Sequence, residues 1–228
     1  MSIADNLSNI KNRISHVCNK VGRDASAIDI IAVSKTVTEV RIKEAIEAGI
    51  SNIGENRVQD AWQKYQILGS SAIWHMIGRL QTNKVKRALQ FFDFIHSVES
   101  KHLAEEISRR ADQLGKDINI LIEVNTSGED TKIGVDPEKT VGFLKQIAHL
   151  PRLNILGLMT IGAFLPDPEQ VRPCFITLRE LRDRIISEGF DEIHMKYLSM
   201  GMTDDFEVAI EEGSNMVRIG RAIFGDRL

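Results

Sequence analysis

Hydrophobic residues in this chain of 228 residues occur alternately in short continuous runs and in longer segments with helical periodicity. The first helical segment is predicted at residues 5–21, where apolar side chains recur along one face: Leu7, Ile10, Ile14 and Val17. Eight short apolar runs after it predict strands at residues 28–33, 52–54, 73–77, 94–97, 119–124, 155–160, 195–199 and 216–219. The helical patterns between these runs begin near Thr38, Arg57, Thr82, Ser100, Pro137, Pro168 and Thr203.

Strand and helix alternate about eight times without a linker rich in proline, glycine or serine. This order predicts an α/β protein with one parallel sheet, folded as a single domain over residues 1–228. The most economical arrangement is a closed (β/α)8 barrel, the TIM barrel, with an extra helix at its amino terminus. An open doubly wound sheet is the alternative, although such sheets more often carry a glycine fingerprint after the first strand. Here that place holds Ser34-Lys35-Thr36-Val37.

The composition is that of an ordinary globular protein, with 43% hydrophobic and 27% charged residues. The formal net charge of −3 gives no general attraction to nucleic acid or to anionic lipid. Cys18 and Cys174 are far apart in the chain and lie in amphipathic helical patterns, so neither a disulfide framework nor a zinc site is indicated. Because no secretory signal and no membrane-spanning run is visible, we expect a soluble cytoplasmic protein that binds neither nucleic acid nor membrane.

Lys35 closes the apolar run at residues 28–34, and a helical segment begins soon after it, near Thr38. The carboxyl ends of parallel strands are where such a barrel presents its chemistry, and a lysine amine there can form a Schiff base with an aldehyde. The alternative is a lysine that lays its stem over apolar surface and leaves its charge in water. Position alone favours that alternative, so the choice depends on the rest of the chain.

The last two predicted strands each lead into a turn of small and hydroxyl residues that is followed by a helix start. Backbone N–H groups at such a junction bind anions, and TIM barrels frequently hold a phosphate on the loops after strands seven and eight. The alternative is that Gly201 and Gly220 are turn glycines and that Ser199 and Thr203 are helix caps. The presence of both segments at one end of a predicted barrel favours a phosphate site.

A Schiff-base lysine on the first strand and a phosphate site on the last two are the two anchors of pyridoxal 5'-phosphate. The first and eighth strands of a closed barrel are neighbours, so both anchors can reach one cofactor. Arg218 lies on the eighth strand between them and could face the pyridine nitrogen. An arginine keeps that nitrogen unprotonated and so weakens the ring as an electron sink. A structural ion pair inside the barrel is the alternative role for Arg218.

Distinctive strings spread in order over essentially the whole chain carry a family resemblance. They are residues 32–36 (AVSKT), 53–59 (IGENRVQ), 74–84 (WHMIGRLQTNK), 157–161 (GLMTI), 198–205 (LSMGMTDD) and 217–225 (VRIGRAIFG). On these strings the chain resembles the pyridoxal phosphate homeostasis protein family. The fold of that family is similar to the barrel domain of bacterial alanine racemase, the fold-type III group of pyridoxal phosphate proteins.

The resemblance implies the roles of individual residues. Lys35 is then the lysine that binds the cofactor covalently through its side-chain nitrogen, and Arg218 is the partner of the pyridine nitrogen. The other cofactor-binding residues fall into two groups, those that line the ring (Asn56, His75 and Met159) and those around the phosphate (Ser199, Met200, Gly201, Thr203, Gly220 and Arg221). A satisfied core histidine is the alternative for His75. Residues 124–134 also resemble the family and predict a loop over the site, in which we expect Lys132 to be solvated.

A racemase needs a second acid/base group opposite the Schiff-base lysine, and in alanine racemases that group is a tyrosine from a separate domain. Here Tyr65 is expected outside the barrel, Tyr197 is expected to be packed, and the chain stops soon after the last strand. The resemblance implies a non-catalytic carrier that buffers pyridoxal phosphate and supplies it to dependent apo-enzymes. The absence of a second domain removes the racemase mode of dimerisation, so we expect a monomer. The alternatives are a minimal racemase or lyase that uses Lys35 with His75, and a regulatory protein that senses the cofactor.

Overall fold

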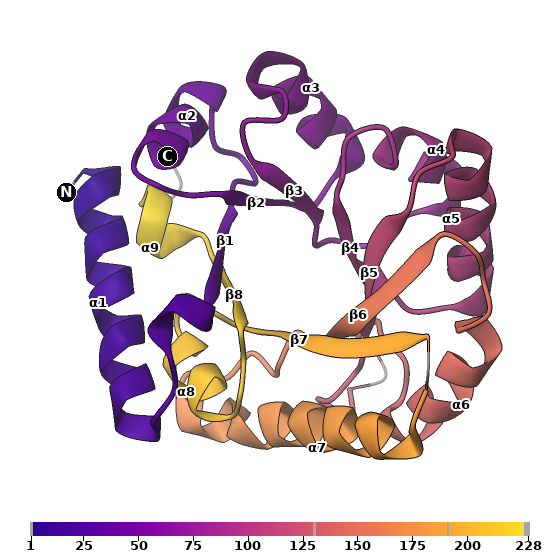
Figure 1. The fold of residues 1–228 in the computed structure, drawn as a ribbon. Coiled ribbons are helices and arrows are strands. Elements are labelled where there is room, and N and C mark those ends of the chain that lie inside the picture. Colours follow the sequence, from indigo (N-terminus) through magenta and orange to yellow (C-terminus); the bar gives the residue numbers. More distant parts are fainter. Residues whose placement is uncertain (1, 130, 191, 226–228) are drawn as a thin grey trace.

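The computed structural model describes residues 2–129, 131–190 and 192–225, and in these ranges parallel strands close into a barrel in chain order (Figure 1). The strands are β1 (Asp29–Val33), β2 (Asn52–Glu55), β3 (Ile73–Met76), β4 (Phe94–Val98), β5 (Ile118–Glu123), β6 (Leu153–Met159), β7 (Ile193–Met202) and β8 (Met216–Ile219). Closure comes from parallel pairing of β1 with β8, in which Ile31 lies beside Arg218. The predicted TIM barrel is confirmed, and the open doubly wound sheet is excluded.

Helices surround the strands in the order that the sequence pattern predicts (Figure 1). The α-helices are α1 (Ile3–Val21), α2 (Glu39–Glu47), α3 (Val58–Leu68), α4 (Val85–Ala88), α5 (Lys101–Leu114), α6 (Pro137–Ile147), α7 (Arg172–Glu188), α8 (Phe206–Glu211) and α9 (Arg221–Phe224). Short 3-10 helices are η1 (Ala25–Ala27), η2 (Thr82–Lys84) and η3 (Pro168–Val171). In the described part of the chain, no helix combines the length and apolarity needed to cross a membrane.

The predicted helix start at Thr203 is wrong. Strand β7 continues to Met202, beyond the predicted end at residue 199, and α8 begins only at Phe206. The residues between them form a turn, in which the Asp205 N–H donates to the Met202 carbonyl and the Met202 N–H donates to the Asp205 carboxylate. Because a side chain satisfies the backbone inside this turn, the helix starts later than the apolar periodicity suggests.

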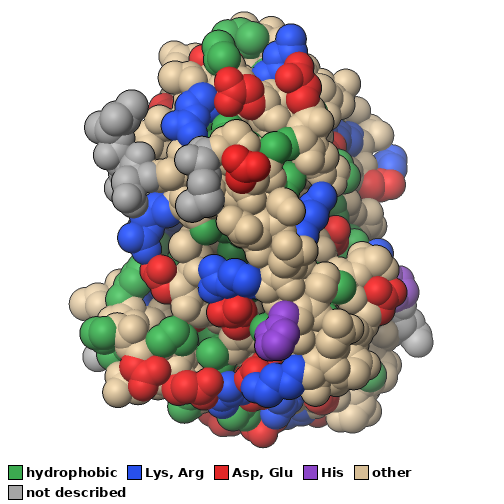
Figure 2. Space-filling view, turned by 90° about the vertical axis from the view of Figure 1, so that its left-hand side faces the viewer, with side chains coloured by type: hydrophobic (Ala, Val, Ile, Leu, Met, Phe, Trp, Pro, Cys, Tyr) green, Lys and Arg blue, Asp and Glu red, His purple; other side chains and the backbone are tan. Residues whose placement is uncertain are grey.

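The extra amino-terminal helix α1 packs against α8 and α9, the helices that follow the last two strands (Figure 1). The Asn6 amide donates to the Ile223 carbonyl at 3.0 Å, and Arg13 forms a two-point ion pair with Glu207. Figure 2 shows this side of the molecule, where acidic and basic side chains are interspersed. Helix α1 thus supports the segments that carry the predicted phosphate loops.

Apolar side chains fill the space between the strands and the helices, whereas the inside of the barrel is only partly apolar. A small apolar cluster lies inside, made of Phe94, Leu121, Met159 and Met216. The same interior holds buried polar residues from several strands: His75, His96, Ser199 and Arg218. Polar groups in this position need internal partners, because water does not reach them.

Gly157 provides a test of the barrel geometry, because a β-carbon at this position would lie 2.0 Å from the Tyr197 carbonyl oxygen of the adjacent strand. We expect Gly157→Ala to lower the free energy of unfolding by about 3 kcal/mol, since strands β6 and β7 must separate. Gly142 in α6 is the matched control, because an added β-carbon there meets no atom within 4 Å. Gly142→Ala should raise the free energy of unfolding by roughly 1 kcal/mol. Equal effects of the two substitutions in urea titrations would contradict this packing.

Candidate cofactor site

Lys35 lies in a tight turn at the carboxyl end of β1. The Val37 N–H donates to the Ser34 carbonyl at 3.0 Å, so residues 34–37 form a β-turn with Lys35 as its second residue. Thr36 has a φ of 65°, a conformation that only a few per cent of non-glycine residues adopt. The surroundings must therefore stabilise this turn, at a cost of about 1 kcal/mol or more.

A buried ion pair under the turn provides this stabilisation. The Lys64 ammonium, on α3, donates to the Ser34 carbonyl and to the Glu55 carboxylate, both at 2.7 Å. The Ser34 hydroxyl donates to the same Glu55 oxygen at 2.5 Å. The Lys64 and Glu55 side chains are only 8% and 1% exposed. Sequence reasoning missed Lys64. The one available signal was Glu55, a charged residue at the end of the otherwise uncharged strand β2.

Lys35 shares one cavity of about 280 Å³ with Gly220 and Arg221, so the structure brings these three predicted residues together. The closure of the barrel explains this, because β1 and β8 are paired and the segments that follow them are neighbours. Arg41 on α2 lines the same cavity and was not predicted. The cavity therefore combines an amine with two guanidinium groups, which suits a ligand that carries an aldehyde and an anionic group.

Arg218 lies inside the barrel and is 5% exposed. Its Nη1 donates to the carbonyl and the hydroxyl of Ser199 at 2.7 and 2.8 Å, and its Nη2 donates to the Thr160 carbonyl at 2.8 Å. Burial lowers the pKa of Arg218 to about 10, so the guanidinium is still charged at neutral pH. The carboxylates of Asp205 and Glu123 raise this pKa through space. Among the described residues, these contacts leave Nε–H and one hydrogen of Nη2 for a further acceptor.

Ser199 and His75 are engaged inside the barrel. Ser199 is fully buried, and its hydroxyl contacts both Arg218 and His96. His75 is also fully buried, with one ring nitrogen 3.0 Å from the Asn52 side-chain oxygen and the other 2.9 Å from His96. This arrangement agrees with the alternative of a satisfied core histidine. Roles of His75 at the cofactor ring and of Ser199 at the phosphate stay predictions.

The two methionines predicted at the site face opposite sides of the barrel wall. Met159 is fully buried in the apolar cluster inside the barrel. Met200 is fully buried in the larger core outside it, between strands and helices. A contact between either sulfur and a cofactor stays a prediction.

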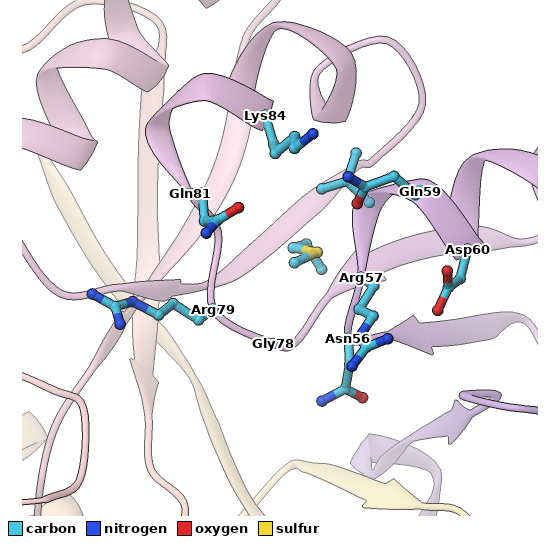
Figure 3. Close-up of a pocket in the computed structure, with 10 residues that line it drawn as sticks. Asn56, Arg57, Gln59, Asp60, Gly78, Arg79, Gln81 and Lys84 are labelled. Atoms are coloured by element: carbon cyan, nitrogen blue, oxygen red, sulfur yellow. The ribbon is translucent and has the colours of Figure 1, made fainter.

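Asn56 directly follows β2, and its side-chain oxygen is buried without a hydrogen-bond partner among the described residues. Such an atom costs about 1–3 kcal/mol unless a donor satisfies it. Asn56 also lines a second cavity, of about 620 Å³, with Arg57, Arg79 and Lys84. Figure 3 shows that these three cationic side chains point in different directions, and Arg79 points away from the other two. The second cavity therefore lacks a converging set of cations for one anion.

The predicted phosphate loops after β7 and β8 are connected by an ion pair between Arg221 and Asp204, at 2.6 Å. Gly201 has a φ of 92°, and a β-carbon there would lie 2.5 Å from that of Ala209 in α8. Glycine near the end of β7 is thus needed by the left-handed backbone there and by the packing of α8. Thr203 is partly exposed in the turn after β7. The structure brings the two loops together, as the sequence predicts.

Glu123, which sequence reasoning also missed, ends β5 beside Met159. Burial raises the pKa of its carboxyl to about 7, against the attraction of Arg218. Glu99 raises that pKa further and Arg79 lowers it. Glu123 is therefore a buried acid that changes charge near neutral pH.

The prediction that Lys132 is solvated is wrong, because its side chain is only 18% exposed. Its ammonium contacts Glu129 at 2.7 Å and the Gly162 carbonyl at 3.2 Å, and it lies over the Phe164 ring. Lys132 thus connects its own loop to the loop after β6. Asp130 of the predicted loop lies outside the described residues.

The two tyrosines lie where the sequence suggests. Tyr65 packs among aromatic side chains outside the barrel, namely Trp62, Trp74 and Phe91. Tyr197 packs edge-on against Phe94 of the interior cluster. Neither contact is typical of a mobile acid/base group.

The alanine racemase amino-terminal domain family model matches residues 6–228. The pyridoxal phosphate homeostasis protein of Aquifex aeolicus is 45% identical over 228 residues, which cover 100% of this chain and 99% of that protein. The protein of the same name from Escherichia coli is 38% identical, and the match covers 97% of that protein. The chain belongs to the pyridoxal phosphate homeostasis protein family.

Solved structures agree with membership in this family. PipY of Synechococcus elongatus, described with pyridoxal phosphate bound, is 31% identical with a TM-score of 0.86, and the match covers 98% of this chain and 100% of PipY. A protein of Bifidobacterium adolescentis is 39% identical with a TM-score of 0.90, and the match covers 97% of this chain and 94% of that protein. Alanine racemase of Clostridium difficile, at 18% identity and a TM-score of 0.74, shares the fold, and this chain covers 56% of it.

Replacing Lys64 tests the buried support of the lysine turn. Lys64→Met leaves the Glu55 carboxylate buried without its cation, so we expect a loss of about 3–5 kcal/mol in the free energy of unfolding. Lys43→Met is the control, since Lys43 makes an exposed pair with Glu47 at 4.0 Å; its effect should stay within about 0.5 kcal/mol. Adding Glu55→Gln to Lys64→Met should recover part of the loss, and a further loss instead would refute the ion-pair account.

Glu123 should make stability depend on pH. Its pKa is about 7 in the folded protein against 4.5 for an ordinary glutamate, so the folded state disfavours the carboxylate and loses stability as pH rises through this window. Glu123→Gln removes this effect. The difference in free energy of unfolding between Glu123→Gln and wild type should therefore be about 2 kcal/mol larger at pH 8 than at pH 5, in favour of the variant. The exposed Glu44→Gln variant should show no such trend, and a flat difference for Glu123→Gln would rule out the shifted pKa.

Proposed function

We propose that this chain holds pyridoxal 5'-phosphate covalently, as a Schiff base at the side-chain nitrogen of Lys35, and releases it to apo-enzymes that depend on it. The protein then acts in vitamin B6 homeostasis as a buffer and a supply of the cofactor. The observation that carries this proposal is the cavity that Lys35 shares with Gly220 and Arg221. The family membership and the cofactor named for PipY support it.

Residues of the cavity, together with residues on or directly after nearby strands, fit this cofactor. Arg41 and Arg221 supply positive charge for a phosphate, and Arg218 retains N–H groups for the pyridine nitrogen. Asn56, which lines the second cavity and follows the strand beside β1, has an unsatisfied side-chain oxygen that can accept a hydrogen bond from a bound molecule. When bound, the cofactor supplies an aldehyde that condenses with an amine and releases one water, and a ring that withdraws electrons.

Each residue of the chain has a distinct part in binding. The turn at residues 34–37 presents the Lys35 amine, and Lys64 with Glu55 keeps that turn in place. Arg218 donates hydrogen bonds and keeps its own proton, so the pyridine nitrogen facing it stays unprotonated. A weak electron sink favours holding the cofactor over using it for turnover.

The state of His75 also supports a carrier over an enzyme. A racemase or lyase that used His75 as its second base would need a ring nitrogen free for substrate. Both nitrogens are occupied by Asn52 and His96, and burial lowers the pKa of His75 to about 3.

Glu123 is the observation that favours the alternative, a minimal amino-acid racemase or lyase. A buried carboxyl with a pKa of about 7 has the proton affinity of a general acid or base at neutral pH. Incubation of the loaded protein with each amino acid in deuterated water separates the two functions. A carrier leaves the α-hydrogen in place, whereas rapid exchange that is lost in Glu123→Gln would establish the enzyme.

A carrier of this kind works as a cytoplasmic monomer, and we infer both properties for this chain. Sedimentation of the loaded protein over a range of concentrations tests the monomer, and a dimer at micromolar concentration would contradict it.

Lys35→Ala tests the proposed function directly. Wild type mixed with pyridoxal phosphate should develop a visible absorption band, and borohydride should fix the cofactor on the peptide that contains Lys35. Lys35→Ala should give neither signal, because the amine is gone. Lys43→Ala, which removes an exposed lysine of α2, should behave as wild type. A fixed label on another lysine in wild type would refute the assignment of Lys35.

A further inference from the structure

A chain of buried hydrogen bonds runs through the barrel from Arg218 to Asn52. The Ser199 hydroxyl, which contacts Arg218, is 3.1 Å from Nδ1 of His96. The other ring nitrogen of His96 is 2.9 Å from Nδ1 of His75, and Nε2 of His75 is 3.0 Å from the Asn52 side-chain oxygen. Strands β2, β3, β4, β7 and β8 each contribute one member, so the chain crosses the interior.

The two ends of the chain fix the direction of every hydrogen bond. The Asn52 oxygen only accepts, so Nε2 of His75 carries a hydrogen and its Nδ1 accepts from Nε2 of His96. Nδ1 of His96 is then an acceptor, and the Ser199 hydroxyl donates to it. From the other end, Arg218 only donates, so the Ser199 oxygen must accept from it and its hydrogen is free for His96.

The surroundings keep both histidines neutral, as this pattern requires. Burial lowers the pKa of His75 to about 3 and holds the pKa of His96 well below its usual value. Electrostatic interactions with His75 and Arg218 lower the pKa of His96 further. His96 is fully buried and is not among the described residues that line the cavity of Lys35. Its ring nitrogens contact His75 and Ser199, and Ser199 connects it to Arg218.

We propose that His96 is a positioning residue for the cofactor ring. By accepting the hydroxyl hydrogen of Ser199, it turns the lone pairs of that oxygen toward Arg218 and fixes the guanidinium that faces the pyridine nitrogen. The inference rests on the proposed function, because it assigns the guanidinium to pyridoxal phosphate.

The tautomers can be tested without any cofactor. Nitrogen-15 spectra of the histidine rings in the cofactor-free protein should show His75 and His96 neutral at pH 6, each with its hydrogen on Nε2. A hydrogen on Nδ1 of His96, or a charged ring, would overturn the proposal. This arm is independent of whether the protein binds pyridoxal phosphate, so it separates failure of the inference from failure of the proposed function.

Substitution of His96 tests its action on the ring. Asparagine can place an oxygen near the position of Nδ1, whereas leucine cannot accept a hydrogen bond. His96→Leu should weaken pyridoxal phosphate binding by up to about tenfold, the upper end of the effect of one neutral hydrogen bond, and should shift the absorption maximum of the bound cofactor. His96→Asn should restore both. The exposed His102→Leu variant is the matched control and should match wild type.

Ser199→Ala distinguishes positioning from a packing role and also covers a failure of His96→Leu to fold. If His96 acts through Ser199, then Ser199→Ala should shift the absorption maximum in the same direction as loss of the histidine. An unchanged spectrum in Ser199→Ala, or equal spectra for His96→Leu and wild type, would overturn the proposal.

Discussion

Pairing of β1 with β8 is the constraint on which the site depends. It aligns Ile31 with Arg218 and Ala32 with Ile219, although these residues come from opposite ends of the chain. The turn that contains Lys35 and the loop that contains Gly220 therefore emerge side by side. Helix α1 strengthens the same junction by packing on α8 and α9. Without closure of the barrel, the Lys35 amine and the Arg221 guanidinium would not share a cavity.

The site also requires costly polar groups in places that water does not reach. The pair of Lys64 with Glu55 and the guanidinium of Arg218 are tolerated because each has partners within hydrogen-bond distance. Removing one partner of such a pair costs far more than removing an exposed one, since the other charge stays buried. This rigidity favours binding, because preformed donors and a backbone turn held in place bind a ligand with little reordering.

Much of this architecture could be predicted from the sequence, because the alternation of apolar runs and amphipathic segments repeats the βα unit. Lys35 and Gly220 were also predictable, since both lie just after strands whose carboxyl ends meet. The supporting residues could not be found in this way. Lys64 looks like any helical lysine, and His96 and Glu123 are distinguished only by which side of a strand faces inward. Register shifts between Ile95 and Val98, and between Ile120 and Leu121, hide that direction from a simple alternating pattern.

In the function proposed for this chain, one pyridoxal phosphate contacts both Lys35 and Arg218. A crystal structure of the protein grown with this cofactor tests it most directly. Continuous electron density should join the cofactor to the side-chain nitrogen of Lys35, with the pyridine nitrogen within hydrogen-bond distance of Arg218. A cofactor bound instead between Arg57 and Lys84, or a ring nitrogen that faces a carboxylate, would contradict the account.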